Sequence, residues 1–132
     1  MRAAVIRRDT GRKVFRLEDL PEYPLGPDQV RVSVRAAGIC GSDVHGFFDF
    51  AGTAREDGLV PGHEAAGEIV EIGSAVRSHS VGDRVTVDPQ IVCGTCPSCR
   101  AGRISICDRK RVTGSSLRGF EQGAMAEHLV VA

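Results

Sequence analysis

Apolar and polar positions alternate along several short stretches of the chain, the pattern of strands with one buried face. The clearest stretch runs from Gln29 to Ala36, where three valines alternate with polar side chains. Helical periodicity is limited to a turn or two after Cys40 and to residues 99–101. We therefore expect a mainly β fold, a small barrel or sandwich with short helices. Further strands are predicted over residues 3–7, 14–17, 68–72, 84–87 and 125–131.

Glycine and proline positions add two expectations about loops and ligands. The weakly patterned stretch from Phe47 to Gly58 is the expected mobile loop. No two of the 16 glycines are spaced as Gly-x-Gly, so the chain has no dinucleotide-binding fingerprint of its own.

The length and net charge of the chain indicate a single domain and exclude some classes of partner. The 132 residues correspond to one domain with a modest core. Seventeen basic residues balance seventeen acidic ones, so no net field would attract nucleic acid or an anionic membrane. Apolar stretches are too short to span a membrane, and two arginines interrupt the N-terminal one, unlike a signal peptide. We expect a cytoplasmic protein.

Four of the five cysteines lie close together. An odd count in a reducing compartment argues against a disulfide framework. Two-residue spacers let neighbouring thiolates point at one tetrahedral zinc ion, and four sulfur ligands leave no position for a substrate. We predict a structural zinc site, with buried reduced thiols or two disulfides as the alternatives. Its ligands would be Cys93, Cys96, Cys99 and Cys107.

Six basic residues surround these cysteines, and they have two interpretations. They could bind nucleic acid as part of a basic zinc module. They could instead balance the negative charge of a zinc tetrathiolate, which we favour because Phe120 is the one aromatic residue nearby. The six are Arg100, Arg103, Arg109, Lys110, Arg111 and Arg118.

The fifth cysteine belongs to a different set of metal-binding side chains. Cys40 follows the clearest strand, and His63-Glu64 lies at the mouth of a strand expected to begin near Glu68. Thiolate, imidazole and carboxylate form a three-ligand set with room for an exchangeable water, which is typical of catalytic zinc. Spacing alone leaves open that Cys40 is a small core residue and His63 a structural histidine.

Five motifs occur in order along the chain. Together they resemble the N-terminal domain of zinc-dependent medium-chain alcohol and polyol dehydrogenases. The resemblance implies a GroES-like β-barrel over residues 1–132, with a structural-zinc lobe at 90–110. A Rossmann domain that binds NAD or NADP follows in that family and is missing here, so we expect a truncation or fragment that is inactive alone. The motifs are Gly-Ile-Cys-Gly-Ser-Asp-Val-His (38–45), Pro-Gly-His-Glu-Ala-Ala-Gly (61–67), Gly-Asp-Arg-Val (82–85), the cysteines of 93–107 and Gly-Ala-Met-Ala-Glu (123–127).

The resemblance implies roles for residues around the catalytic zinc. Cys40 and His63 match zinc ligands, and Glu64 matches either a direct ligand or a close exchangeable neighbour. Asp43 matches the carboxylate that orients the zinc-bound histidine, although it could also cap the following helix. Gly41 is typical of the polyol-like branch, which favours a polyol or secondary-alcohol substrate.

The resemblance also implies a route for the substrate proton. Ser42 matches the hydroxyl that takes the proton of the alcohol, and His45 matches the residue that passes it toward solvent. Phe47, Phe48 and Phe50 either line the substrate pocket or pack against the barrel or the missing domain.

The favoured function is therefore the catalytic domain of an NAD(P)-linked oxidoreductase acting on the CH–OH group of an alcohol or polyol. Its expected partners are that small substrate, the missing Rossmann domain and further copies of itself, with no nucleic acid or membrane. The alternative is a non-catalytic zinc module that binds a partner or nucleic acid. A chaperonin-cofactor-like barrel ranks last, because it needs no zinc ligands.

Overall fold

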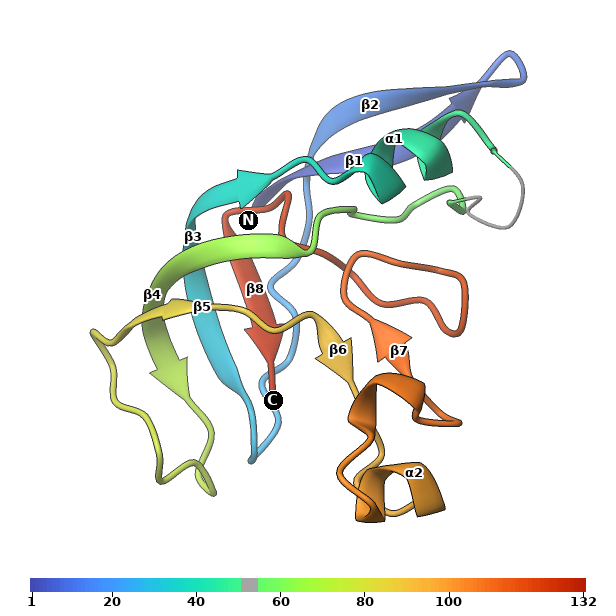
Figure 1. The fold of residues 1–132 in the computed structure, drawn as a ribbon. Helices are drawn as coiled ribbons and strands as arrows, with labels where there is room; N and C mark the ends of the chain where they lie inside the picture. Colours follow the sequence, from blue (N-terminus) through green and yellow to red (C-terminus); the bar gives the residue numbers. More distant parts are fainter. Residues whose placement is uncertain (51–54) are drawn as a thin grey trace.

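A computed structural model describes residues 1–50 and 55–132 of the chain. Strands dominate the described residues and the helices are short, so the prediction of a mainly β fold is confirmed (Figure 1). In chain order the elements are β1 (Arg2–Asp9), β2 (Arg12–Asp19), β3 (Val30–Gly38), α1 (Gly41–Phe47), β4 (Glu64–Ile72), β5 (Arg84–Thr86), β6 (Gln90–Ile91), α2 (Pro97–Arg100), a 3₁₀ turn (Ile104–Ile106), β7 (Arg111–Val112) and β8 (His128–Val131).

The central sheet has the strand order β5-β4-β3-β8, and each pair of adjacent strands is antiparallel. The alternation in β3 places Val30 and Val32 in a core cluster with Ile69 of β4. At Gly67 the two central strands approach so closely that a Cβ would lie 2.2 Å from the carbonyl oxygen of Ser33. Burial of this apolar face is what holds the sheet together.

A long hairpin, β1 and β2, extends away from the central sheet and runs beside α1 (Figure 1). Its turn contains Thr10 and Gly11, both with positive φ, as two-residue hairpin turns of type I′ require. Val5 and Ile6 of β1 are fully buried, whereas β2 is mostly exposed. The hairpin is longer than predicted because its charged residues hide the alternation of its apolar ones.

The cysteine-rich segment forms a lobe apart from the sheet (Figure 1). Its strands β6 and β7 have two residues each and pair with one another, and α2 starts at Pro97, a residue suited to the first turn of a helix. Cys96 and Cys107 are its buried apolar residues between 90 and 110. A lobe with so little core needs another source of stability.

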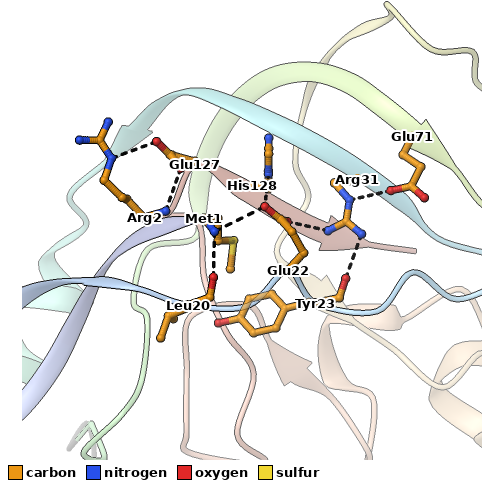
Figure 2. A network of polar contacts seen from close by, with 9 residues as sticks. All are labelled: Met1, Arg2, Leu20, Glu22, Tyr23, Arg31, Glu71, Glu127 and His128. Atoms are coloured by element: carbon orange, nitrogen blue, oxygen red, sulfur yellow. Dashed lines mark hydrogen bonds and ion pairs between the residues drawn. The ribbon is translucent and has the colours of Figure 1, made fainter.

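A polar network ties the N-terminus to the sheet, as Figure 2 shows. The Met1 ammonium donates to the carbonyl oxygen of Leu20 at 2.8 Å. The Glu22 carboxylate lies 2.8 Å from Nδ1 of His128 and 3.0 Å from Nη1 of Arg31. Burial disfavours the charge of Glu22, but these cationic neighbours outweigh it and lower the pKa of the carboxyl. The network joins the segment after β2 to β3 and β8.

Two strands begin at other residues than the sequence predicts. Strand β4 begins at Glu64 rather than near Glu68, because Glu64 pairs with Gly38 at the end of β3. The strand predicted over 125–131 begins at His128, since residues 124 and 125 donate their amides to the carbonyls of Gly62 and Pro61 instead. Of the expected mobile loop, residues 51–54 lie outside the described residues. No helix among the residues described is long and apolar enough to cross a membrane.

Candidate metal centres

The four clustered cysteines bring their sulfur atoms within 4.8 Å of one another. Sulfur–sulfur distances are 4.0 Å for Cys93–Cys99, 4.0 Å for Cys96–Cys107 and 3.6 Å for Cys93–Cys107. Zinc–sulfur bonds of about 2.3 Å place the corners of a tetrahedron about 3.8 Å apart. All five cysteines are free thiols. The donor set thus fits one tetrahedral metal ion and not a pair of disulfides.

Backbone amides favour the ionised form of two of these thiols, Cys93 and Cys96, whereas burial and the neighbouring thiols raise the pKa of Cys99 to about 12. The amides of Thr95 and Cys96 lower the pKa of the Cys93 thiol to about 5, and those of Cys99 and Asp108 lower the pKa of Cys96. Metals bind the thiolate, so this arrangement suits a metal site.

One of the six basic residues around the lobe is placed to balance that negative charge. A hydrogen bond to Cys93 raises the pKa of Arg109, whose Nη2 also donates to Oγ1 of Thr95 at 2.6 Å. Arg111 instead forms an ion pair with Glu121. The contact of Arg109 with Cys93 agrees with the charge-balancing interpretation, whereas the ion pair of Arg111 leaves that residue without this role.

A second cluster joins the end of β3 to the start of β4. The sulfur of Cys40, a ring nitrogen of His63 and a carboxylate oxygen of Glu64 all lie within 4.8 Å of one another. The antiparallel pairing of Gly38 with Glu64 produces this meeting, because it sets the residue two beyond β3 beside the first residues of β4. Cys40 and His63 are half-buried and Glu64 is exposed. Three mixed donors open to solvent on one side suit a catalytic zinc with a free position.

Asp43 contacts the two half-buried donors of this cluster, Cys40 and His63. Its Oδ2 accepts a hydrogen bond from the backbone N–H of Cys40 at 3.0 Å, and its Oδ1 lies 3.6 Å from Nδ1 of His63. The carboxylate is 5% exposed, and Oδ1 has no hydrogen-bond partner among the described residues. A carboxylate facing Nδ1 directs the other ring nitrogen, Nε2, toward a metal.

The capping role suggested for Asp43 is wrong in its position. Cys40 is the N-cap of α1, and Asp43 is the third helical residue. Its contact with the Cys40 amide is the carboxylate half of a capping box. Capping of the helix and orientation of His63 therefore use the two oxygens of one carboxylate.

Helix α1 also carries the two residues assigned to proton transfer. The Ser42 hydroxyl lies 3.5 Å from Nε2 of His63. His45 is one turn further on the same helix face, is exposed and meets Phe50 edge-on with 5.4 Å between ring centroids. Phe48 and Phe50 are 65% and 56% exposed. Helix α1 therefore has Ser42 beside the metal cluster and His45 in contact with solvent.

Sequence reasoning missed two basic residues that hold α1. Lys13 of β2 donates to the carbonyl oxygen of Gly46 at 2.7 Å, and Arg55 lies 3.4 Å from the carbonyl oxygen of Ser42. Both contacts join residues far apart in the chain, so no local spacing could reveal them. The clue that exists, burial of a charged side chain, is visible only in the fold.

The amino-acid sequence is similar to those of known dehydrogenases. The family model described as the alcohol dehydrogenase GroES-like domain matches residues 26–132. An L-threonine 3-dehydrogenase of Xanthomonas oryzae pv. oryzae (strain MAFF 311018) is 35% identical over 97% of this chain and 37% of its own length. A sorbitol dehydrogenase of Bacillus subtilis (strain 168) is 39% identical over 81% of this chain and 30% of its own length.

Solved structures show the same relationship. A galactitol-1-phosphate dehydrogenase from Escherichia coli superposes with a TM-score of 0.84 at 33% identity, over 99% of this chain and 36% of its own. The chain therefore spans about a third of the length of these relatives.

Proposed function

Since the chain belongs to the family of alcohol dehydrogenase GroES-like domains, we propose that it is the catalytic domain of a zinc-dependent, NAD(P)-linked oxidoreductase. Its substrate would be the CH–OH group of an alcohol or polyol. The observation that carries the proposal is the cluster of Cys40, His63 and Glu64 with Asp43 behind it. A structural centre alone would need only the four-cysteine lobe.

The two donor sets would hold zinc for different purposes. Cys93, Cys96, Cys99 and Cys107 would stabilise their lobe, since four thiolates saturate a tetrahedral ion. A zinc ion bound by Cys40, His63 and Glu64 would act as a Lewis acid on the substrate oxygen, because that set leaves a position open.

Residues of α1 would manage the proton. The Ser42 hydroxyl lies 3.5 Å from Nε2 of His63, so it would be close to a substrate hydroxyl at the open position, and it could accept that proton while releasing its own toward His45. His45 is exposed one turn further along, and an imidazole can both accept and release a proton, so it can pass that proton to solvent. Glu64 would complete the donor set and reduce the net charge of the site.

The nicotinamide cofactor would bind mainly to another part of the protein. This chain has no Gly-x-Gly spacing and covers 37% of the length of the threonine 3-dehydrogenase. A Rossmann domain would bind the dinucleotide, and its hydride chemistry belongs to the cofactor. The names of the relatives, a sorbitol and an L-threonine 3-dehydrogenase, favour a secondary alcohol as substrate.

The test compares the chain with the whole protein encoded by its gene. The chain mixed with a secondary alcohol and NAD should give no rise in absorbance at 340 nm, and the whole protein should give one. Ser42→Ala in the whole protein should lower kcat/KM by about 10²–10⁴-fold with zinc content unchanged. Ser78→Ala, on an exposed loop, is the matched control. Full activity of Ser42→Ala, or sustained turnover by the chain alone, would contradict the proposal.

A further inference from the structure

Lysine 13 lies far from both metal clusters in the sequence, and its side chain is only 2% exposed. From β2 its ammonium group crosses to the end of α1, where it donates to the carbonyl oxygen of Gly46 at 2.7 Å and pairs with the carboxylate of Asp49. Lysine is rarely buried unless it is paired. Gly46 is in the last turn of α1 and Asp49 lies just after the helix, so Lys13 joins the hairpin to the end of α1.

Helix α1 depends on such outside contacts. It has seven residues, and helices of this length are unstable alone. A cation at the C-terminus of a helix bonds to carbonyl groups without partners in the helix and opposes the helix dipole. Asp49 adopts a left-handed backbone with φ of 57° just after the helix, and the hydrogen bond from Lys13 lowers the pKa of its carboxyl.

A second residue of β2 contacts the same end of the helix. The rings of Phe15 and Phe47 stack with 4.8 Å between centroids and 7° between planes. Lys13 and Phe15 are two positions apart on a strand, so they share one face. Arg16, on the opposite face of the same strand, is 56% exposed and pairs with Asp9 instead. The hairpin therefore contacts α1 through one face only.

The other end of α1 belongs to the open metal cluster. Its N-cap, Cys40, supplies the sulfur donor, and its first turn supplies Asp43, which contacts the Cys40 amide and faces His63. A two-turn helix fixed at its last turn has its first turn fixed as well. We propose that Lys13 is a positioning residue of this site: by anchoring the end of α1 it keeps Cys40 and Asp43 in register with His63. The inference rests on the proposed function, because it assumes that the cluster binds metal.

Cobalt(II) binding to the chain tests this inference. The four-cysteine site is first filled with one equivalent of zinc, and the open site is then titrated with cobalt, whose visible absorption reports its ligands. Lys13→Met should lower cobalt affinity at least 10-fold and shift the absorption bands, since outer residues that orient ligands typically contribute about 10–100-fold in affinity. Lys13→Arg keeps a donor for Gly46 and should restore most of the affinity. Arg16→Met, which removes an equally basic, ion-paired residue of the same strand, should leave it unchanged.

The outcomes distinguish a loss of folding from a loss of positioning of the metal ligands. An unfolding temperature of Lys13→Met close to that of the unsubstituted chain shows that the chain is folded, and unchanged cobalt affinity in that case would overturn the inference. Should Lys13→Met fail to fold, Asp49→Asn removes the ion pairs that this exposed carboxylate makes with Lys13 and Arg8, and it should lower the affinity in the same direction. Equal affinity of Asp49→Asn and the unsubstituted chain would then overturn it. An unsubstituted chain that takes up no cobalt at the open site would contradict the proposed function itself.

Discussion

Glycine 38 makes room for the carboxylate of the open metal cluster, and this space can be filled by one methyl group. An ideal Cβ at Gly38 would lie 2.5 Å from Oε2 of Glu64 and 3.1 Å from its Cβ. Nonbonded atoms prefer separations of about 3.5 Å or more, so Gly38→Ala should displace the carboxylate by about 1 Å. Because metal–ligand distances tolerate only about 0.2 Å, Glu64 should leave the donor set.

The expected result is a loss of metal affinity without a loss of fold. The closer clash involves the far end of an exposed side chain, which can rotate for about 1 kcal/mol, and the contact with the Cβ of Glu64 needs only a small shift of the strands. Unfolding temperature should therefore change by less than about 5 °C. Affinity of the open site, measured by competition with a chelator, should fall about 10–100-fold. The four-cysteine site should keep its metal.

Gly41→Ala is the matched control, because it adds the same methyl group three residues away where no atom lies within 4 Å. Its open-site affinity should equal that of the unsubstituted chain. A folded Gly38→Ala variant with undiminished affinity would refute the reasoning, since Glu64 would then contribute nothing to the site.

Three further predictions concern the lobe, acid stability and the polar network. Cys107→Ser should remove one metal ion and accelerate hydrogen exchange at residues 90–110 while leaving cobalt spectra of the open site unchanged; an unchanged lobe would contradict its dependence on metal. The hydrogen bond from Arg7 lowers the pKa of Glu18, so its stabilisation is fully present above the ordinary carboxyl pKa of about 4.3 and is lost as pH falls toward the lowered value. Arg7→Gln should accordingly weaken the dependence of unfolding temperature on pH between about 5 and 3, and an unaltered dependence would count against this ion pair. Glu22→Gln removes the negative charge that the network in Figure 2 shares, on a side chain that is 44% exposed. Urea unfolding should show that the free energy of unfolding falls by no more than about 1 kcal/mol, because solvent screens exposed ion pairs. A decrease several times larger would contradict this screening.

The sequence predicted the strands whose apolar residues alternate and the metal donors that lie close together in the chain. The alternation at Val30 and Val32 identifies the buried face of the strand correctly. The cysteines of the lobe lie together because the spacers between them are short. The start of β4 was placed too late, because Glu64 and the small residues after it carry no branched or aromatic side chain and extend only by pairing with β3. Lys13 could not be found, because it looks like any basic residue of a hairpin until the fold buries it against α1.

The central claim is that one small domain holds two metal sites of different kinds, and elemental zinc analysis tests it most directly. The freshly purified chain should contain about two zinc ions, and Cys40→Ser and Cys107→Ser should contain about one each, if one site is closed by four thiolates and the other is open. Zinc content that stays at about one in the unsubstituted chain and in Cys40→Ser would show that only the lobe binds metal, and would contradict the claim.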